Sequence, residues 1–600
     1  MRPIQHLPMP MPKDYDPGPK FFYENFVKQF IPDMIQMMSN GMHIDKKAVE
    51  ELRAVIEEVQ TSIYERIEKS EIINDYRKSR LPKLQKEHYE KATKSVRDYT
   101  YYLTNYKPAD MVHRTWVINT YLGRKGKARD KKEKWSVKDL KQYNIFFKDN
   151  LVSEIIAKRP LSANKYVVEG MRELAKYKAD MWNKVRYENA ETPVPLPDFN
   201  PNSSLQIKEL FEMLEIEPLA FSPDTGEASW GREQIEQVQK EVTDEAILDV
   251  LEILIDNSFS AIIKNNFLKA FDTFTVDGVL HGNIVLFGAK SFRNTSNSPN
   301  LLNMPSTKSI YAKPLKKCFV TGDDDYLVFT ADLSALEDRE IANLSGDENK
   351  QNVFIEGLDG HSLNACGYYK NDLEKIMGVN TNNVDYVKRF MALVEEENKA
   401  ICDFRQKGKG PTFKLAYGGF PDAHKGGVIT QEIFDNYHGI LYPGITDYRE
   451  NYVLKTAQEQ GYIHLGLGCR MYASNPSDSI RTLHNATIQF WSILTLIAIN
   501  ELHHRIREEK LEKYIQVNST IYDSIYTRTY RDPEIIQWLN KNLIEVMTVQ
   551  HLENEVVPNE AEGELGKNWA DLHKVKNNAS VDDIKEVLKI IYDKNGKANR

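Results

Sequence analysis

The stretch YLVFTADLSALEDRE, residues 326–340, decides the fold. Its apolar run from Tyr326 to Phe329 predicts a buried strand, and this strand ends at Asp332. A second carboxylate, Glu337, follows five residues later in another apolar setting. A carboxylate at the end of a buried strand is costly unless a partner compensates its charge. The first question is therefore which partner these two carboxylates have.

The composition is that of a large globular protein. The chain has 600 residues, of which 41% are hydrophobic, and this length predicts about three or four domains or subdomains. The four cysteines are far apart and form no CxxC pair, so the sequence indicates neither a disulfide framework nor a zinc site. The apolar run 490–499 is too short to span a membrane. We expect a cytoplasmic protein without a membrane partner.

The charge is unevenly distributed along the chain. A formal net charge of −8 argues against a wholly basic nucleic-acid binder. Residues 124–141, RKGKARDKKEKWSVKDLK, nevertheless hold nine Lys or Arg residues against three acidic ones. This local excess of positive charge is typical of a phosphate-binding surface, although a solvated loop would have the same composition.

Helical and strand signals alternate along the chain. Residues 22–106 and 346–512 have helical periodicity, and residues 581–591 predict one short amphipathic helix. Residues 272–345 carry strand signals, with a turn at Asp277-Gly278. Residues 514–530, YIQVNSTIYDSIYTRTY, are rich in β-branched and aromatic residues, and Tyr522-Asp523-Ser524 at their centre predicts a turn.

Two aspartates at strand edges, Asp332 and Asp523, suggest a metal site. Two carboxylates brought together across a sheet do not both stay ionised cheaply unless cations lie between them, and such oxygen ligands suit Mg²⁺. Two bound ions could then serve phosphoryl transfer. Taken alone, each aspartate could equally be an ordinary turn residue.

A second pattern is the stretch RQKGKGPTFKLAYGG, residues 405–419. Arg405, Lys409, Phe413 and Tyr417 recur every four residues, which leaves all four along one slowly winding helix face. Two cations beside aromatic rings could hold a triphosphate and a base. The alternative is a solvated cation stripe beside a core aromatic residue.

These motifs resemble the DNA polymerase I family, also called family A. ADLSALEDRE, KGKGPTFKLAYG and TIYDSIY resemble the motifs A, B and C of that family in the same order. SFRNTSNSPNLLNMP, DGHSLNA, RTLHNATIQ, FNPNSSLQIKELF and GELGKNWADLH resemble further segments of the family. The resemblance runs from about residue 22 to residue 573 and implies an α+β, right-hand polymerase architecture with an antiparallel palm sheet and helical fingers and thumb.

The resemblance also implies a domain plan. It divides the chain into an N-terminal arm at 1–21, the thumb with a leading palm segment at 22–257, a first palm part at 258–345, fingers at 346–479, a second palm part at 480–575 and a C-terminal tail at 576–600.

Residue roles follow from the resemblance in the same way. Asp332 and Asp523 would bind two catalytic Mg²⁺ ions, for which Mn²⁺ could substitute, and Glu337 would be the steric gate that rejects a ribose 2′-hydroxyl. The nucleotide-binding residues implied are Arg405, Lys409, Phe413, Tyr417 and His361, with Lys409 also catalytic. The residues implied to contact DNA near the primer terminus are Arg293, Asn300, Asn303, Arg481, Asn485 and Gln489. The implied partners are primer-template DNA and deoxynucleoside triphosphates.

The sequence departs from the family pattern at three places. Motif C is usually His-Asp-Glu but is Tyr522-Asp523-Ser524 here, so the third carboxylate is missing. The usual Gln of the PNLQN segment is Leu302. Pro411 is expected near the first turn of a helix, which would leave Arg405 before that helix or on a kink.

Two rival functions stay open at this point. Single-subunit RNA polymerases share the hand-like fold and often carry Asp-Ser in motif C, but they leave the gate position small, unlike Glu337. A catalytically dead DNA-binding relic is disfavoured because Asp332, Asp523 and Lys409 are all present.

The resemblance also predicts an absence and an addition. No strand-borne Asp-x-Glu pair precedes the thumb-like sequence, so we expect no proofreading exonuclease in this chain, and a separate subunit could supply one. The segment 107–197 lies where some bacteriophage polymerases carry a thumb insertion that recruits a processivity partner. We therefore expect a bacteriophage-type enzyme, acting in the host cytoplasm, whose insertion contacts DNA or a processivity partner.

Overall fold

The computed structural model describes residues 16–104, 191–218, 228–305, 310–379, 384–421, 429–553 and 555–593. The chain forms two compact units: Met1–Thr61 with Ser258–Arg600, and Ser62–Asn257. We call them the sheet unit and the helical unit. The basic run 124–141 and most of the predicted insertion at 107–197 lie outside the described residues. The predicted domain plan stays a prediction.

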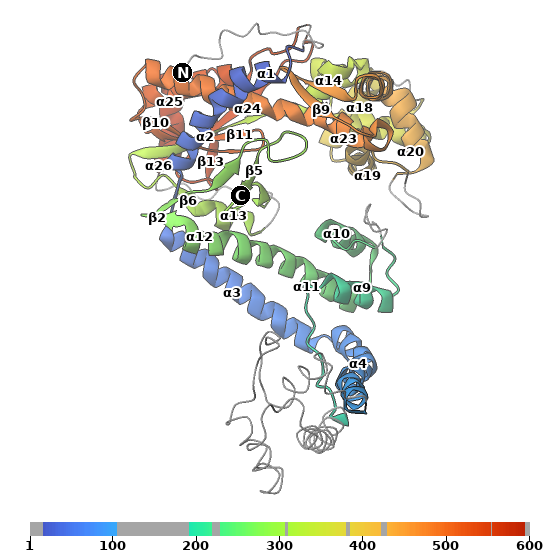
Figure 1. Ribbon diagram of the computed structural model, residues 1–600. Helices are drawn as coiled ribbons and strands as arrows, with labels where there is room; N and C mark the ends of the chain where they lie inside the picture. Colours follow the sequence, from blue (N-terminus) through green and yellow to red (C-terminus); the bar gives the residue numbers. More distant parts are fainter. Residues whose placement is uncertain are drawn as a thin grey trace, which may run out of the picture. The chain divides into compact units, whose positions relative to one another are not determined.

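A five-stranded antiparallel sheet is the centre of the sheet unit (Figure 1). Its strand order is β10 (Ile515–Ile521), β11 (Ser524–Tyr530), β7 (Tyr326–Leu333), β12 (Ala561–Gly566) and β13 (Leu572–Val575). The run around Phe329 therefore becomes the middle strand. Because β7 has a neighbour on both sides and its residues from Leu327 to Ala331 are all buried, an almost continuous apolar run suits it better than strict alternation.

Apolar helices fill the core beside this sheet. Helix α24 (Ile493–Glu508) contacts β10 and β11, and α25 (Pro533–Met547) contacts β7, β11 and β12. Helix α2 (Lys28–Asn40) packs on α24 and β10, which joins the N-terminal part of the chain to this core. Other helices that contribute to this core are α1 (Pro19–Phe22), η2 (Tyr23–Val27), η8 (Phe490–Ser492) and α26 (Val581–Tyr592).

Three smaller antiparallel sheets complete the strands of this unit. Four short strands pair in the order β2 (Thr275–Val276), β3 (Val279–Leu280), β1 (Met42–Ile44) and β6 (Phe319–Val320). The other two sheets are the pairs β4 (Asn283–Val285) with β5 (Thr295–Asn297) and β8 (Tyr462–Gly466) with β9 (Cys469–Tyr472). Asp277 and Gly278 both have positive φ angles, 51° and 83°, so they form the turn that the sequence predicts between β2 and β3.

The region between β7 and β10 is mainly helical, as the sequence predicts. Helices α14, α18, α19, α20 and α23 gather at one end of this unit (Figure 1). Their bounds, with those of the intervening helices, are α14 (Leu336–Ser345), α15 (Glu348–Ile355), α16 (Gly360–Tyr368), α17 (Lys370–Met377), α18 (Val384–Glu395), α19 (Lys399–Ala416), α20 (Gln431–Asn436), η6 (Tyr437–Leu441), α21 (Pro443–Asp447), η7 (Tyr448–Leu454), α22 (Lys455–Gln460) and α23 (Pro476–Gln489). The β8–β9 hairpin inside this region was not predicted.

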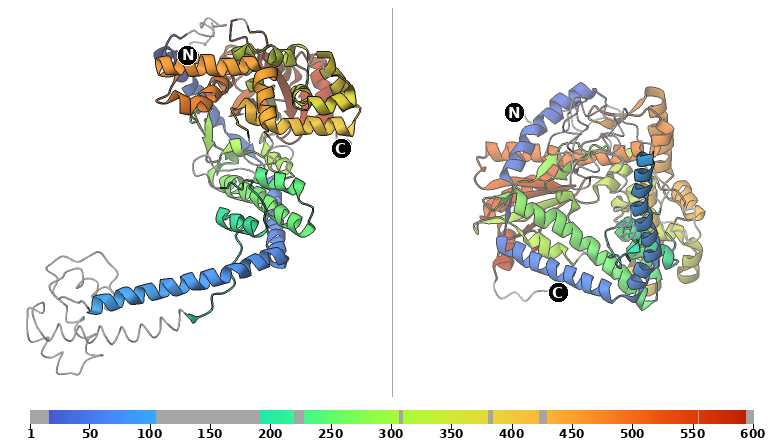
Figure 2. Two further views of the ribbon diagram at one scale, coloured as in Figure 1. Left: turned by 90° about the vertical axis from the view of Figure 1, so that its right-hand side faces the viewer. Right: turned by 60° about the horizontal axis from the view of Figure 1, so that its bottom comes forward.

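The helical unit is built from long helices. Helix α4 (Glu71–Thr104) is the longest helix among the described residues (Figure 2). Tyr76 of α4 donates a hydrogen bond of 2.8 Å to Glu209 of α9 (Ser204–Met213). Ser203 caps α9 by accepting a hydrogen bond from the Gln206 amide. The other helices here are α10 (Arg232–Glu241), the C-terminal end of α3 (Lys46–Lys69) and the greater part of α11 (Glu245–Ile262).

The linking segment after α11 carries η4 (Ile263–Leu268), α12 (Lys269–Phe274), η5 (Leu301–Asn303) and α13 (Ala312–Lys317). Together, helices and antiparallel sheets occur in both halves of the sequence, and the predicted α+β class is confirmed.

One continuous helical stretch, Pro476–Glu508, is long and apolar enough to cross a membrane. However, 72% of its most apolar window is buried inside the protein. The apolar residues of α23 and α24 thus belong to the protein core.

Candidate active site

The two aspartates of the sequence prediction lie at neighbouring strand ends. Asp332 is the last but one residue of β7 and lies directly opposite Ser524, the first residue of β11. Asp523 occupies the turn just before β11, and its carbonyl oxygen accepts a hydrogen bond of 3.2 Å from the Leu333 amide. The pairing of β7 with β11 therefore brings both carboxylates to the same end of the sheet, although 191 positions separate them in the sequence.

One carboxylate oxygen of Asp523 has no hydrogen-bond partner. Its Oδ1 atom is buried without a hydrogen-bond partner. Burial raises the pKa of Asp523 to about 6, and repulsion from Asp332 adds to this rise, while the positive charge of Arg293 opposes it. A buried acceptor that lacks a donor is expected to find another partner, such as a cation.

Asp332 has a related environment. Its surroundings exclude part of the water around the carboxylate and raise its pKa, although the residue keeps contact with solvent. The Ser524 hydroxyl donates a hydrogen bond to Asp332 and opposes this rise. Glu562 of β12, directly opposite Asp332 on the other side, adds repulsion. Ser524 thus contacts Asp332 from the position where the family usually has the third carboxylate.

Sequence reasoning did not find Glu562. The alternation of Glu562 and Glu564 in AEGELG shows that they share one strand face. It does not show which strand that face adjoins. Glu562 also forms an ion pair of 2.6 Å with Lys574 on β13.

Unusual backbone conformations lie next to both aspartates. Tyr522, directly before Asp523, has φ 52°, and Ala335, three residues after Asp332, has φ 51°. Non-glycine residues avoid this left-handed region because Cβ crowds the backbone, and such residues cluster at functional sites. Ala335 is also the N-cap residue of α14, so this turn lies between β7 and the helix that carries Glu337.

Glu337 is the centre of a polar cluster. It lies in the first turn of α14, accepts a hydrogen bond from the Tyr417 hydroxyl and forms an ion pair with Arg293. The Arg293 guanidinium also lies 5.8 Å from the centre of the Tyr522 ring. The Tyr522 hydroxyl donates a hydrogen bond of 3.1 Å to the Leu302 carbonyl. The motif A, motif B and motif C segments therefore meet around Glu337.

Two residues of α23 hold the end of α19 in this cluster. Arg481 Nε donates to the Tyr417 carbonyl oxygen at 2.9 Å, and Asn485 Nδ2 donates to the same atom at 3.4 Å. Gln489, the third predicted residue of α23, lies two turns from Arg481 and has no hydrogen bond described. The four-residue spacing of this trio thus keeps the three residues on one face of α23.

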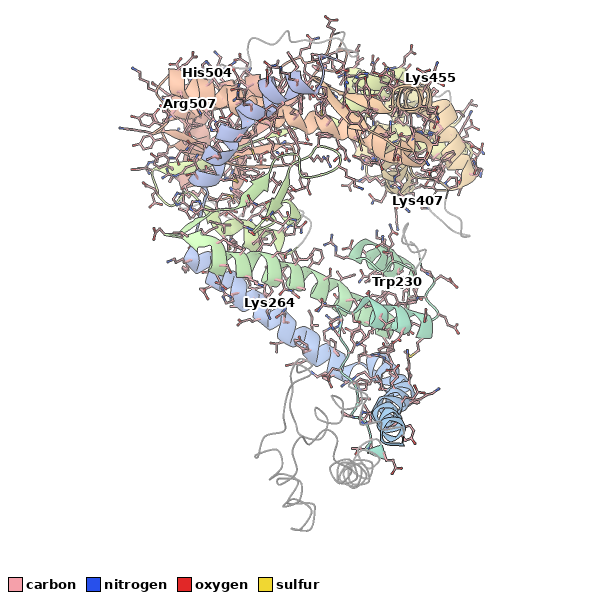
Figure 3. All side chains as sticks on the ribbon, viewed as in Figure 1. Trp230, Lys264, Lys407, Lys455, His504 and Arg507 are labelled. Atoms are coloured by element: carbon pink, nitrogen blue, oxygen red, sulfur yellow. The ribbon has the colours of Figure 1, made fainter. Side chains whose placement is uncertain are left out.

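The predicted phosphate-binding cations lie on and beside α19. The charges of Lys409 and Arg405 both act on His361, whose pKa is lowered by burial and then by these two cations. His361 is in the first turn of α16. Lys407, also on α19, extends into solvent (Figure 3). The three predicted residues are thus close enough to act on one anion.

Arg405 is engaged by a residue that the sequence analysis did not single out. Its Nε and Nη2 atoms donate to the two carboxylate oxygens of Asp359 at 2.7 and 3.0 Å. Burial alone would raise the pKa of Asp359, but hydrogen bonds from Arg405 and Ser362 lower it to about 2. Asp359 also caps α16 through the Ser362 amide. Asp359, the first residue of DGHS, is a helix-cap signal, which could have marked the residue but not its partner.

Helix α19 accommodates Pro411 in its interior. The helix runs without interruption from Lys399 to Ala416, so Arg405, Lys409 and Phe413 all lie within it and Tyr417 caps its C-terminus. The expectation that Pro411 marks the first turn is therefore wrong. Thr412 Oγ1 donates to the Gly408 carbonyl at 2.7 Å, which supplies a hydrogen bond close to the proline where the backbone ladder lacks one.

The remaining predicted DNA contacts lie around η5. Asn300 caps η5 by accepting a hydrogen bond of 3.1 Å from the Leu302 amide, and Asn303 ends that turn. A small pocket beside them is lined by residues that include Arg293, Leu302 and Tyr522. This pocket adjoins the Glu337 cluster, so η5 belongs to the same site.

The donor set fits divalent cations. Asp332 and Asp523 offer adjacent carboxylates with raised pKa values, and one oxygen of Asp523 has no other partner. Within the described residues no group of three or more His, Cys, Asp or Glu side chains has the geometry of a metal site. Mg²⁺ is commonly held by only one or two carboxylates together with substrate phosphates and waters, so two aspartates are sufficient.

The raised pKa of Asp523 predicts a pH-dependent stability difference. An aspartate with a pKa near 3.9 in the unfolded chain and about 6 in the folded protein binds its proton more tightly when folded. The free energy of unfolding therefore falls as the pH rises from about 4 to about 6, by roughly 2–3 kcal/mol in total. We expect Asp523→Asn to be more stable than the wild type at pH 8 without metal, and this advantage to vanish near pH 4. Urea unfolding in EDTA measures it, and an advantage of equal size at both pH values would contradict the assigned pKa.

The comparisons with known proteins agree with this geometry. A family model described as DNA polymerase family A matches residues 168–571, more than half of the chain. The chain belongs to DNA polymerase family A. The fold of this family A chain is accordingly the α+β polymerase fold, with motifs A, B and C meeting at Glu337.

Several curated relatives are DNA polymerases I. The chain is 24% identical to DNA polymerase I of Chloroflexus aurantiacus over 454 residues, which cover 72% of this chain and 43% of the relative. It is 25% identical to the thermostable DNA polymerase I of Thermus filiformis over 304 residues, 48% of this chain and 32% of the relative. The family A chain thus spans less than half the length of these relatives.

Among solved structures, the chain is similar to the POL domain of Pol1 from M. smegmatis in complex with DNA primer-template and dNTP. The match covers 79% of this chain and 81% of that one, with 18% sequence identity and a TM-score of 0.49.

Proposed function

We propose that this family A chain is a template-directed DNA polymerase, which adds deoxynucleotides to the 3′ end of a DNA primer. The proposal rests on one observation. Asp332 and Asp523 lie together at the ends of neighbouring strands, beside the cluster of Glu337, Tyr417 and Arg293. The family match supports the same activity. Primer-template DNA and deoxynucleoside triphosphates are the proposed substrates.

The proposed chemistry is phosphoryl transfer. Asp332 and Asp523 would hold two Mg²⁺ ions, which supply activation of the primer 3′ hydroxyl and neutralisation of the charge on the leaving pyrophosphate. The chain's own part is to bring the two carboxylates together at neighbouring strand ends and to orient the reactants. The strained turns at Tyr522 and Ala335 keep both carboxylates close to the Glu337 cluster, where the sugar would lie.

The triphosphate would be bound by Lys409, Arg405 and His361. Arg405 reaches it only if its hydrogen bonds to Asp359 open or are shared. Because Asp359 holds Arg405 in a fixed orientation before the substrate arrives, little side-chain freedom would be lost on binding. Phe413 lies on α19, and its role in stacking on the base stays a prediction.

Glu337 would exclude ribonucleotides. The ion pair with Arg293 and the hydrogen bond from Tyr417 hold its carboxylate in place, so a ribose 2′-hydroxyl would meet a side chain that does not yield. The proposed DNA contacts of Arg293, Arg481, Asn485, Gln489, Asn300 and Asn303 surround this cluster. Minor-groove acceptors are similar for all base pairs, so donors there would test pairing geometry without reading sequence.

A primed DNA template tests the proposed function directly. The purified chain is given deoxynucleotides or ribonucleotides separately, with Mg²⁺, and extension of a labelled primer is measured on a gel. We expect extension with deoxynucleotides that is at least about tenfold more efficient than with ribonucleotides. Equal or better use of ribonucleotides would favour the RNA polymerase reading, and binding of DNA without any extension would favour the DNA-binding relic.

Two further proposals concern the insertion, which lies outside the described residues, and a subunit separate from this chain. We propose that the insertion around 124–141 increases processivity, by contacting DNA phosphates or a partner protein. We also propose a bacteriophage-type enzyme, for which a separate subunit could supply the removal of mismatched primer ends.

A further inference from the structure

Three side chains fasten α14 to the segment 551–560. Arg339 donates to the Pro558 carbonyl and to the Glu560 carboxylate, both at 2.6 Å. Asn343 donates to the Val557 carbonyl at 2.8 Å and accepts from the Val557 amide at 2.9 Å. These contacts lie on the helix that carries Glu337, but on its side toward the C-terminal part of the chain.

The third contact between α14 and residues 551–560 is the buried pair of Glu340 and His551. Glu340 Oε2 lies 3.0 Å from His551 Nε2, and both side chains are completely buried. Glu555 Oε2 lies 3.5 Å from His551 Nδ1, and the Asn559 amide lies 3.4 Å from the same nitrogen. The Trp491 ring covers the imidazole at a centroid distance of 4.4 Å. None of the residues that form this cluster has a role in the proposed mechanism.

Stability alone does not account for such a pair. Removing two charged or polar groups from water costs about as much as their attraction provides, and apolar side chains of similar volume often stabilise equally well. A buried hydrogen bond between two elements does fix their relative position, because only one position satisfies both partners. The Glu340–His551 pair therefore defines where α14 lies against residues 551–560.

The same segment also reaches the catalytic strand. The Ser334 amide donates to the Glu560 carbonyl at 2.8 Å, and β12 then pairs with β7 so that Glu562 lies opposite Asp332. Residues 551–560 thus connect the end of β7 with the body of α14. Glu337 lies one helical turn before Glu340, so a displacement at Glu340 moves Glu337 with it.

We propose that the buried Glu340–His551 pair is a positioning pair that holds α14 in the register at which Glu337 discriminates deoxyribose from ribose. The inference rests on the proposed polymerase function and on the proposed role of Glu337. A side chain that rejects one hydroxyl group must be placed to within a fraction of an ångström, and its supporting contacts determine that placement.

The molecule offers a matched control in another part of the sheet unit. His503 Nδ1 lies 2.8 Å from Asp33 Oδ1, and both side chains are at least nine-tenths buried. This pair fastens α2 to α24, with Asn500 and Arg507 as further partners of Asp33. Arg507 and its neighbour His504 are seen on α24 in Figure 3. The control pair has similar chemistry, but it joins α2 to α24 and not α14 to residues 551–560.

The test compares His551→Gln with His503→Gln. For each full-length variant, the efficiency of single-nucleotide insertion is measured for a deoxynucleotide and for the matching ribonucleotide, together with the free energy of unfolding. We expect His551→Gln to lower the preference for deoxynucleotides about tenfold or more, and His503→Gln to leave it within about twofold at a comparable loss of stability. An unchanged preference in His551→Gln, or an equal change in both variants, would overturn the inference.

Two further variants keep the test decisive. Glu340→Gln retains an acceptor for His551 Nε2, so we expect it to keep most of the preference. If His551→Gln does not fold, the double variant Glu340→Leu with His551→Leu replaces the pair by apolar side chains, and we expect a folded protein with relaxed sugar selection. A folded double variant with the wild-type preference would refute the positioning role.

The outcomes separate this inference from the proposed function. A wild-type chain that extends no primer contradicts the polymerase proposal itself. If the wild type extends primers and Glu337→Ala relaxes sugar selection while His551→Gln and the double variant do not, only the positioning role fails.

Discussion

Replacing either Asp332 or Asp523 with asparagine is expected to reduce primer extension by about a thousandfold or more, because metal-ion stabilisation of the transition state contributes several kcal/mol. The Asn side chain has nearly the same shape but lacks the charge that holds a divalent cation. Since the two carboxylates lie at one edge and share one function, the double variant is expected to be scarcely worse than either single variant. Extension rates are measured under single-turnover conditions with saturating primer-template.

DNA binding is expected to survive these substitutions. The proposed DNA contacts lie on α23, η5 and Arg293, and neither aspartate is among them. Fluorescence anisotropy with a labelled primer-template should give dissociation constants within about threefold of the wild type. For Asp523→Asn, Mg²⁺ should also no longer raise the unfolding temperature, whereas it should do so for the wild type.

The same strand provides the control for this prediction. Asp325 lies just before β7, at the end remote from Asp332, where it pairs with Arg531 at 2.8 Å. Asp325→Asn removes a carboxylate from the same sheet without touching the proposed site, and it should extend primers at nearly the wild-type rate. Retention of more than a few per cent of activity in Asp523→Asn would contradict the assignment of Asp523 as a metal ligand.

Replacing Glu337 with alanine should relax sugar selection by about ten- to a hundredfold, the range that the presence or absence of a small group in a fitted pocket provides. The substitution removes the side chain that a ribose 2′-hydroxyl would meet. It also leaves Tyr417 and Arg293 without their shared acceptor, so the rate with deoxynucleotides should fall several-fold as well. The ratio of insertion efficiencies for the two sugars is the quantity to measure.

Two other substitutions separate the size of Glu337 from its charge. Glu337→Gln keeps the volume and an acceptor for the Tyr417 hydroxyl but loses the ion pair with Arg293, so sugar selection should persist if steric exclusion is the cause. Asp338→Ala, one residue further along α14, removes an exposed carboxylate that pairs with Lys350 and should leave the ratio unchanged. If Glu337→Ala kept the wild-type ratio of insertion efficiencies for the two sugars, the proposed role of Glu337 as steric gate would be wrong.

Local patterns in the sequence were sufficient to predict the elements that carry the site. The apolar run before Asp332 became β7, the turn at Tyr522-Asp523-Ser524 became the β10–β11 connection, and the amphipathic stretch near the C-terminus became α26. Each of these depends on residues within a few positions of one another, because backbone pairing and hydrophobic periodicity are local properties. The four-residue spacing of Arg405, Lys409 and Phe413 was realised on α19 for the same reason.

Pro411 is the instructive failure among these local predictions. Its intrinsic preference argued for a helix start, yet α19 continues through it. The helix packs along α16, and the neighbouring Thr412 forms hydrogen bonds with Gly408 and Asn364. Tertiary packing of this kind outweighs the cost of one missing backbone hydrogen bond.

By itself, the sequence determined the elements, the α+β class and, through its motifs, the family and the residues to inspect. Only the tertiary structure decided which partners those residues have: Asp359 for Arg405, Ser524 for Asp332, and Tyr417 with Arg293 for Glu337. The buried Glu340–His551 pair joins residues 211 positions apart, and nothing in either local sequence indicates the other. The physical reason is that charge compensation and burial depend on which distant segments the fold brings together, whereas strands, helices and turns are specified by neighbouring residues.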